Sequence, residues 1–277
     1  MTTDNTVLIT GCSSGIGLCT ARQLRARGYR VFATARQLVD VRKLRDEGFE
    51  AVELDLADSS SIRHAVSVVL AATNGKIYAL FNNGAYGQPG AVEDLRREVL
   101  REQFETNLFG THELTNLLIP VMRQQGYGRI IQNSSVLGFA AMRYRGAYNA
   151  SKFALEGLTD TLRLELAGTG IHVSLIEPGP ISSRFRDNAF AMYRKNIESL
   201  HSAHRENYLA IESRLQKQGP AVPFTLGPEA VAAKVIHALE ARRPRTRYYV
   251  TFPTYLFGYL KRLLPDRMLD WLLGKVG

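Results

Sequence analysis

Hydrophobic positions along the chain fall alternately into short aliphatic or β-branched runs and longer segments with helical spacing. One of the helical segments opens with Asp58, a residue type that caps helix N-termini. The alternation predicts strands joined by helices along most of the chain. The expected helices are 15–27, 39–48, 58–73, 97–124 and a segment around Tyr148, and the expected strands are 6–10, 29–35, 49–55, 77–82, 128–135 and 171–179.

This order predicts an α/β fold with a doubly wound parallel sheet of about seven strands and helices on both faces. Strands separated by helices of ten or more residues pair in parallel through right-handed crossovers. The runs 77–81 and 172–176 are almost continuously apolar, which is typical of strands buried on both sides. With 277 residues, 45% hydrophobic, and no linker or repeat, we expect a single domain over 1–277.

Cysteine usage and the N-terminus favour a cytoplasmic protein. Only Cys12 and Cys19 occur, so no disulfide framework is expected. The first ten residues lack the basic start and long apolar run of a signal peptide. No stretch has the uninterrupted apolar length of a membrane-spanning helix.

The net charge of +9 is compatible with nucleic acid, an anionic membrane or an anionic small molecule as partner. The sequence has no zinc-ligand spacing, no RNP-like aromatic signature and no concentrated basic tract. We therefore expect neither a nucleic-acid partner nor a metal site. The basic residues near the C-terminus leave contact with an anionic membrane open.

A glycine-rich turn, 10–17, links the first predicted strand to the first predicted helix. Gly11 suits a sharp turn, Gly15 suits close approach of the backbone to a pyrophosphate, and Gly17 lets the helix pack on the sheet. The unpaired N–H groups of the helix N-terminus favour an anion. A tight strand-to-helix turn alone would use the same residues, but the position after the first apolar strand favours nucleotide binding.

The end of the second strand predicts which dinucleotide is bound. An acidic residue there would accept from a ribose 2′-hydroxyl, but the chain has Arg36 and no acid. A charge-assisted hydrogen bond contributes about 1.5–3 kcal/mol, or roughly ten- to a hundredfold preference for a 2′-phosphate. We therefore expect NADP(H), although a solvated arginine at a strand end is the simpler alternative.

Tyr148 and Lys152 lie four positions apart and share one face of a predicted helix. One reading is structural: the tyrosine packs and the lysine extends to water. The other is chemical: a cation about 4 Å from the phenol, at a dielectric near 20, contributes about 4 kcal/mol, or up to about three pKa units. The second reading makes the phenol a general acid or base.

Together these motifs resemble the short-chain dehydrogenase/reductase family over roughly residues 6–185. The resemblance implies a Rossmann-type fold and hydride transfer between a nicotinamide and a carbonyl or carbinol carbon. The matching residues are Thr10, Gly11, Gly15, Gly17, Asp55, Asn107, Ser135, Tyr148, Lys152, Pro178, Gly179, Ile181 and Ser183.

The resemblance also implies residue roles. Tyr148 exchanges the proton, Ser135 holds the substrate oxygen, and Lys152 binds the nicotinamide ribose. Asn107 anchors a water that links Lys152 to solvent. Each has a structural alternative: Ser135 satisfies a strand end, and Asn107 holds a helix kink. The implied dinucleotide contacts are Thr10, Gly11, Ser13, Ser14, Gly15, Ile16, Gly17, Arg36, Asp55, Leu56, Asn83, Gly84, Tyr148, Lys152, Pro178, Gly179, Ile181 and Ser183.

One position departs from the family pattern, which usually has Asn-Asn-Ala-Gly after the fourth strand. This chain has Gly84 followed by Ala85. If the backbone at Ala85 had to be left-handed, the side chain would cost about 1–2 kcal/mol. The exchange concerns the local dinucleotide geometry and leaves the reaction class unchanged.

The segment 184–227 corresponds to the substrate lid of the family, and its residues 184–216 predict one or two amphipathic helices. A looser similarity to bacterial NADP-dependent aldehyde reductases and to the 17β-hydroxysteroid and retinol dehydrogenase-like branch implies a hydrophobic aldehyde or ketone. The expected substrate residues are Val136, Phe139, Met142, Tyr144 and Phe185, and further lid residues that might line the pocket are Phe190, Met192, Tyr193, Leu200 and Tyr208.

The tail, 254–277, is amphipathic, with aromatic residues among lysines and arginines and a break at Pro265. It suits a helix that caps the core or joins a subunit interface, and it also suits contact with the inner membrane surface. The resemblance implies a homodimer or homotetramer built on 97–124 and the helix around Tyr148. Two other functions stay open: a non-catalytic dinucleotide sensor, and a membrane-associated steroid or retinoid dehydrogenase.

Overall fold

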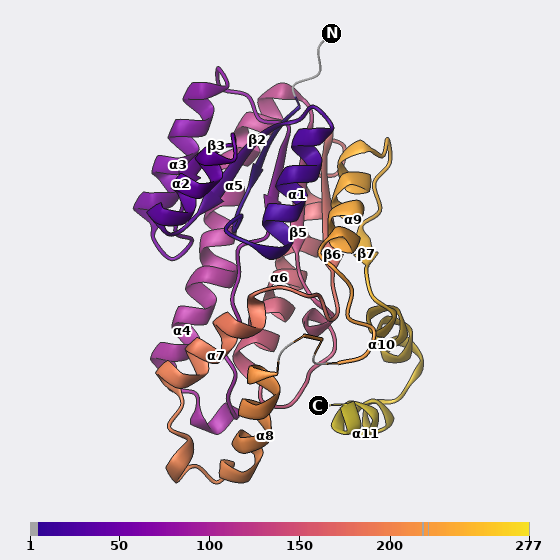
Figure 1. Cartoon of the computed structure of the whole chain (residues 1–277). Helices are drawn as coiled ribbons and strands as arrows, with labels where there is room; N and C mark the ends of the chain where they lie inside the picture. Colours follow the sequence, from indigo (N-terminus) through magenta and orange to yellow (C-terminus); the bar gives the residue numbers. More distant parts are fainter. Residues whose placement is uncertain (1–4, 218, 221, 277) are drawn as a thin grey trace.

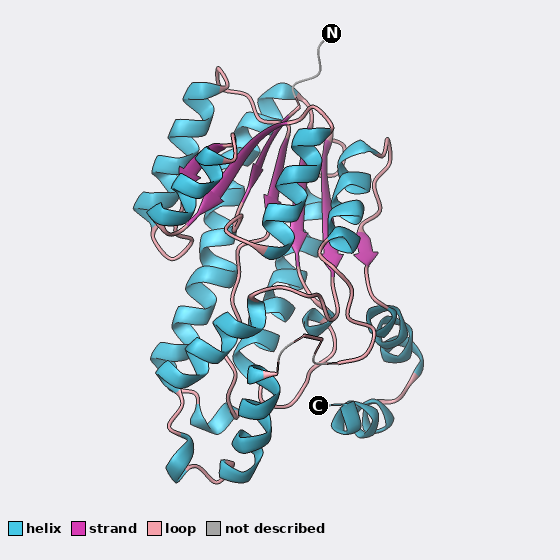
Figure 2. Ribbon diagram, in the orientation of Figure 1, coloured by secondary structure: helices cyan, strands magenta, loops and turns pink. Residues whose placement is uncertain are grey.

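The computed structural model describes residues 5–217, 219–220 and 222–276 of the chain. Its seven parallel strands form one sheet in the order β3-β2-β1-β4-β5-β6-β7 (Figures 1 and 2). This confirms the predicted doubly wound sheet. The strands are β1 (Thr6–Ile9), β2 (Arg30–Ala35), β3 (Glu50–Glu53), β4 (Ala79–Asn82), β5 (Gly128–Asn133), β6 (Ile171–Glu177) and β7 (Arg247–Tyr249).

Successive residues of a strand point to opposite sides of the sheet. Both sides carry apolar side chains here, and helices cover both. Val7 and Ile9 of β1 pack into one core, and Leu8 packs into the other. The first core is closed by α1 (Gly15–Ala26), α2 (Leu38–Asp46) and α9 (Glu229–Glu240). The second is closed by α3 (Ser59–Ala72), α5 (Gly110–Gln125) and α6 (Gly146–Glu165).

The strand order creates the crevice in which the site lies. Val7 of β1 pairs with Val31 of β2 on one side and with Ala79 of β4 on the other. The chain therefore leaves the sheet in opposite directions after β1 and after β4. In open α/β sheets, ligands bind outside the carboxyl ends of the strands at such a point.

Three elements differ from the sequence prediction, and one of them is α9, which was not among the expected helices. The expected single helix over 97–124 is divided into α4 (Arg97–Phe104), a π-helical turn η2 (Glu105–Phe109) and α5. Strand β7, which the apolar pattern did not reveal, adds Arg247–Tyr249 at the edge beside β6.

The predicted lid and tail each form helices with a small core of their own (Figure 1). The lid contains α7 (Phe185–Asn196), the turn η4 (Ser199–His201) and α8 (Arg205–Gln216), and it packs beside the turn η1 (Val92–Asp94). The tail contains α10 (Phe252–Leu263) and α11 (Asp266–Val276), separated near Pro265 as expected. Positions 218 and 221 of the lid and 277 of the tail lie outside the described residues.

Candidate active site

The glycine loop adopts a backbone that requires glycine at its first two glycine positions. Gly11 has φ +71° and Gly15 has φ +57°, in the left-handed region that side chains disfavour. A Cβ on Gly17 would lie 2.2 Å from the carbonyl oxygen of Gly11, so the first turn of α1 lies directly against the loop. Ser14 precedes α1 without capping it through its side chain. The geometry fits a pyrophosphate over the N-terminus of α1.

Asn83, which follows β4, ties this loop to the rest of the site. Its Nδ2 donates to the carbonyl oxygens of Thr10 and Gly11 at 3.0 and 3.1 Å. The Thr10 hydroxyl accepts from the backbone N–H groups of Asn83 and Gly84 at 2.9 and 2.8 Å. The Asn83 side chain thus supports the loop, and its expected contact with the dinucleotide stays a prediction.

The Gly84-Ala85 exchange carries no backbone strain, because Ala85 does not adopt a left-handed conformation. Gly84 occupies the crowded position: a Cβ there would lie 3.0 Å from Leu56 Cδ1 and 3.2 Å from Thr10 Oγ1. The condition for a cost at Ala85, a left-handed backbone, is therefore not met in this chain.

The predicted adenosine-side residues lie at the carboxyl ends of β2 and β3. Arg36 is exposed directly after β2. Burial raises the pKa of the nearby Tyr86 phenol to about 12, and the charge of Arg36 offsets a small part of this rise. The Asp55 carboxylate accepts from the backbone N–H of Ala57 at 2.9 Å, and Leu56 is buried beneath it. No described carboxylate forms an ion pair with Arg36.

Tyr148, Ser135 and Lys152 lie together where β5 ends and α6 begins. Tyr148 and Lys152 come from the first two turns of α6, and Ser135 precedes the turn η3 (Val136–Gly138). The Ser135 hydroxyl hydrogen bonds with the Tyr148 phenol. Lys152 Nζ lies 5.7 Å from the centroid of the Tyr148 ring and donates to the Asn133 carbonyl oxygen at 2.6 Å. This proximity fits the catalytic group implied by the resemblance.

Burial controls the protonation of this group. It raises the pKa of Tyr148 above its usual value of 10, and the bond to Ser135 only partly offsets this. Lys152 is not among the groups that change the Tyr148 pKa here, so the predicted lowering of that pKa by the lysine stays a prediction. Burial also lowers the pKa of Lys152 to about 8, against the attraction of Glu156. The phenol keeps its proton at neutral pH and can act as an acid.

Asn133 connects the proton-exchanging group with the glycine loop. Its carbonyl oxygen accepts from Lys152, and its Nδ2 donates to Asn83 Oδ1 at 2.9 Å. Because Asn83 in turn holds Thr10 and Gly11, a continuous set of hydrogen bonds runs from the loop to Lys152. Sequence reasoning did not single out Asn133, although its position at the end of a buried strand was a signal.

Asn107 lies buried in the π-helical turn η2 and binds across the loop after β4. Its Nδ2 donates to the Tyr86 carbonyl oxygen at 2.9 Å and to Ser151 Oγ at 3.1 Å, while its Oδ1 accepts from the Tyr86 N–H at 3.1 Å. These contacts match the alternative in which Asn107 holds an irregular helix turn. The water relay to Lys152 stays a prediction.

A cluster of carboxylates close to Lys152 was not predicted from the sequence. Glu156 follows Lys152 by one helical turn, and the Arg247 guanidinium of β7 contacts Glu156, Glu177 and Asp160 together. One cation beside three carboxylates cannot neutralise them all. Burial and the neighbouring Glu156 raise the pKa of the Glu177 carboxyl to about 8. We therefore assign the proton of the cluster to Glu177, which is completely buried.

The segment after β6 closes the crevice from the substrate side. The Pro178 carbonyl oxygen accepts from the Val136 N–H at 2.8 Å and lies 3.4 Å from Ser135 Oγ. A Cβ on Gly179 would lie 2.1 Å from Thr251 Oγ1, so the start of α10 packs directly on this turn. Ser183 approaches the glycine loop: its Cβ lies 3.0 Å from the place a Gly15 Cβ would take. Ile181 pairs with Leu226 at the end of the lid.

Four of the five predicted substrate residues lie beside the phenol. Val136, Phe139 and Met142 pack in one cluster with Tyr148, and the Phe185 ring meets the Tyr148 ring edge-on at 5.3 Å. Tyr144 instead belongs to the lid core, 6.1 Å from the ring of Tyr208.

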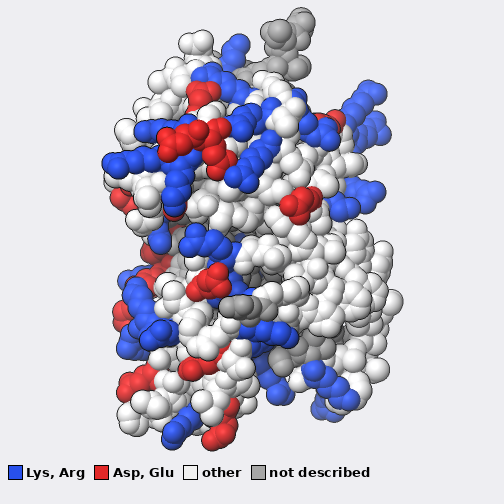
Figure 3. Space-filling view, viewed as in Figure 1, with Lys and Arg blue, Asp and Glu red and all other residues white. Residues whose placement is uncertain are grey.

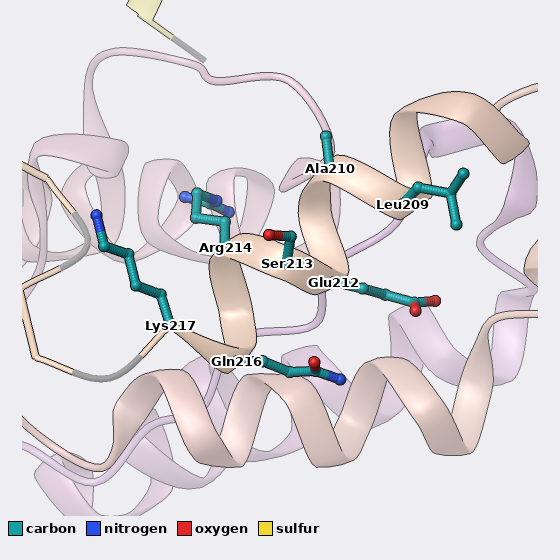
Figure 4. Close-up of a pocket in the computed structure, with 7 residues that line it drawn as sticks. All are labelled: Leu209, Ala210, Glu212, Ser213, Arg214, Gln216 and Lys217. Atoms are coloured by element: carbon teal, nitrogen blue, oxygen red, sulfur yellow. The ribbon is translucent and has the colours of Figure 1, made fainter.

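The other aromatic residues of the lid mostly serve its own packing. Tyr193 and Tyr208 are buried in the lid core with Phe190, and Leu200 is exposed. Their helical spacing reflects this packing. A separate open hollow lies along α8, and it contains none of the predicted catalytic residues (Figure 4). Within the described residues, no group of histidine, cysteine or acidic side chains is placed to hold a metal ion.

Comparison with known proteins identifies the family. The sequence model of the short chain dehydrogenases matches residues 5–194. The chain belongs to the short-chain dehydrogenase/reductase family. It is 43% identical to the uncharacterized oxidoreductase YbbO of Escherichia coli over 267 residues, covering 96% of this chain and 93% of YbbO. It is 33% identical to 17-beta-hydroxysteroid dehydrogenase type 1 of Homo sapiens over 260 residues, covering 88% of this chain and 77% of that enzyme.

Solved structures of short-chain dehydrogenases share the fold and bind nicotinamide dinucleotides. A Burkholderia phymatum member in complex with NAD matches with a TM-score of 0.76 and 27% identity, over 98% of this chain and 95% of that one. A variant of actinorhodin polyketide ketoreductase with NADPH matches with a TM-score of 0.72 and 30% identity, over 89% of this chain and 95% of that one. This chain is accordingly an oxidoreductase of the family that uses NAD or NADP.

Proposed function

We propose that the chain is an NADP(H)-dependent oxidoreductase that interconverts a hydrophobic aldehyde or ketone and its alcohol. One observation carries the proposal: Tyr148, Ser135 and Lys152 lie together at the carboxyl ends of the strands, joined through Asn133 to the glycine loop. A proton donor and a dinucleotide cradle at one edge of the sheet are what carbonyl reduction needs.

The chain's own residues handle the oxygen and its proton. When bound, a nicotinamide dinucleotide supplies the hydride for reduction or accepts it for oxidation. The Ser135 and Tyr148 hydroxyls would hold the carbonyl oxygen, and Tyr148 would give it a proton as negative charge develops there. The Tyr148 phenol holds its proton at neutral pH and can supply it during reduction. Lys152 would bind the nicotinamide ribose and supply positive charge beside the phenol.

Substitution of Tyr148 tests the catalytic role. Tyr148→Phe removes the O–H while keeping the ring, so turnover of NADPH with aliphatic and aromatic aldehydes should fall by at least about a thousandfold, within the range typical of general acid catalysis. NADPH affinity, measured by fluorescence titration, should change little. Tyr259→Phe, at an exposed site on α10, is the matched control and should keep full activity. Full turnover by Tyr148→Phe would refute the role, and tight binding without turnover by the wild type would instead support a dinucleotide sensor.

Preference for NADP(H) rests on Arg36. Its guanidinium is exposed after β2 and has no carboxylate partner among the described residues, so it is available for a 2′-phosphate. Arg36→Ala should lower the ratio of kcat/KM for NADPH to that for NADH by roughly ten- to a hundredfold. Arg42→Ala, an exposed change on α2, should leave the ratio unchanged. A wild type that prefers NADH would contradict the assignment.

A hydrophobic substrate is supported by the residues around the phenol. Apolar surface beside the phenol comes from Val136, Phe139, Met142 and Phe185. The acidic side chains of Glu156 and Glu177 hydrogen bond with Arg247. A ranked series of aldehydes of increasing chain length should show kcat/KM rising with apolar area. A preference for sugars or amino acids would exclude this substrate class.

We also propose that the chain works in the cytoplasm as a homodimer or homotetramer. Cys12 and Cys19 are unpaired thiols, which suits a reducing compartment. The turn η2 exposes Phe109, and helix α6 exposes Phe153 and Leu158, apolar surface that a second copy would cover. Sedimentation velocity of the purified chain measures the number of subunits.

A further inference from the structure

The outer sides of the two C-terminal helices present a continuous stretch of apolar side chains to solvent. Their inner sides pack on the catalytic wall, since Phe257 of α10 and Leu273 of α11 join the cluster that contains Val136 and Tyr148. The outward residues recur at helical spacing along α10 and continue on α11. This C-terminal apolar face consists of Phe252, Tyr255, Leu256, Tyr259, Leu263, Met268 and Trp271.

The face extends onto the end of the lid. The Phe224 ring lies 5.0 Å from that of Phe252, and both are more than half exposed. Figure 3 shows the surface in the region of α10 as largely uncharged on the side in view, with lysine or arginine side chains below it. Soluble monomers seldom expose an apolar surface of this kind without a partner.

Cations surround the face. Residues 252–276 contain four lysines and arginines and two aspartates. Arg143 adds a further cation beside α11, because its guanidinium lies 3.4 Å from the place a Gly274 Cβ would take. Lys275 lies over the Trp271 ring, with Nζ 3.7 Å from its centroid. Ion pairs among the described residues involve none of these cations, so their charge remains available to an anionic surface.

These features fit a lipid surface better than a second copy. In a two-fold dimer the same patch meets itself, which would bring Lys261, Arg262 and Arg267 of the two copies toward one another with few acids to pair them. Aromatic side chains mixed with lysine and arginine are the composition of helices that lie in a membrane interface. Within the described residues no helix has the length and apolarity to cross a bilayer, so the helices would lie on it.

We propose that the C-terminal apolar face docks the enzyme on an anionic phospholipid surface. The inner sides of the same helices touch the catalytic wall, so docking brings the lipid within about one helix diameter, roughly 10 Å, of the substrate pocket. An apolar carbonyl compound dissolved in the bilayer would then enter the site without crossing water. This second consequence rests on the proposed function, whereas docking itself does not.

The single tryptophan of the chain reports docking directly, because Trp271 lies within the face and is 60% exposed. Vesicles of phosphatidylcholine with phosphatidylglycerol should shift its emission to the blue and sediment with the full-length protein. Vesicles of phosphatidylcholine alone should bind at least about tenfold more weakly, and added salt should weaken binding to the anionic vesicles.

Paired variants separate the face from the rest of the surface. Leu256→Ser with Leu263→Ser should raise the lipid concentration for half-maximal binding by roughly tenfold or more, since both side chains would be buried in the interface. The matched control, Leu200→Ser with Leu209→Ser, alters two exposed leucines of the lid and should bind lipid as the wild type does.

Two results would overturn the proposal. One is the absence of any emission shift and any co-sedimentation with anionic vesicles. The other is a wild-type oligomer that the Leu256→Ser, Leu263→Ser variant dissociates, because the face would then be a subunit interface. Turnover of a short water-soluble aldehyde, measured without vesicles, should be the same for both paired variants. That assay tests the proposed function separately from docking.

Discussion

Replacing Arg247 with methionine removes the cation that contacts Glu156, Glu177 and Asp160 at once. The Glu177 side chain is completely buried and that of Glu156 is 9% exposed, so neither can be solvated when the guanidinium is lost. Methionine keeps much of the apolar stem of arginine. The change therefore isolates the charge.

Removing one partner of a buried ion pair typically costs about 3–5 kcal/mol of unfolding free energy, because the remaining charge is left uncompensated. We expect Arg247→Met to lose this amount at pH 8. Arg27→Met is the matched control: it breaks an ion pair with Glu240 in which both side chains are about half exposed, and it should cost about 1 kcal/mol or less. Urea unfolding followed by circular dichroism measures both losses.

The loss should shrink as the pH falls. Burial raises the pKa of Glu177 to about 8 and also raises the pKa of Glu156, so the folded protein binds these protons more tightly than the unfolded chain. As the pH falls below about 8, Glu177 takes up its proton and needs no cation, so the difference in unfolding free energy between wild type and Arg247→Met should narrow at lower pH. A loss for Arg247→Met no larger than that for Arg27→Met, or one independent of pH, would refute the reasoning.

Two further predictions concern groups close to the chemistry. Glu156 raises the pKa of Lys152, so Glu156→Gln should lower it from about 8 and move the alkaline limb of the pH–kcat profile to lower pH, whereas an unmoved limb would separate Glu156 from Lys152. Gly17→Ala should weaken dinucleotide binding and cost about 1–3 kcal/mol, because its Cβ would lie 2.2 Å from the Gly11 carbonyl oxygen. Gly157→Ala, with no neighbour within 4 Å on the exposed side of α6, should instead stabilise by about 0.5–1 kcal/mol in the same urea assay.

Local patterns predicted six of the seven strands and the glycine loop. The spacing of apolar residues indicates which side of a strand or helix is buried. The positive φ angles of Gly11 and Gly15 belong to a tight turn that the spacing of the glycines already indicated. Strand β7 was missed because its three residues stand in an arginine-rich stretch whose role depends on pairing with β6. The π-helical turn at Glu105–Phe109 was missed for a related reason: one inserted residue barely disturbs helical periodicity.

The sequence predicted the motif residues of the site but not the side chains that contact them. The spacing of Tyr148 and Lys152 placed them on one helix face, but the distance and burial that decide their pKa values depend on the packed fold. The contacts of Arg247 with Glu156 and Glu177 join residues about 70 to 90 positions apart, so no local sequence pattern predicts them. Aromatic spacing in the lid was ambiguous between packing and substrate contact, and Tyr208 and Tyr193 turned out to be packing residues.

The lid and the C-terminal helices keep separate small cores, distinct from the two cores that hold the sheet. A substitution in the lid core, such as one at Tyr193, therefore changes packing that the glycine loop and Lys152 do not share. Selection can alter which molecules enter the crevice by changing the lid, while the dinucleotide cradle stays as it is; the C-terminal helices, in contrast, pack in one cluster with Tyr148. The family model, which ends at residue 194, stops shortly after the lid begins. Beyond that residue, α8 of the lid is where a new substrate range can evolve at little risk to folding, because α9 and Arg247 belong to the core and the ion pairs that hold the sheet.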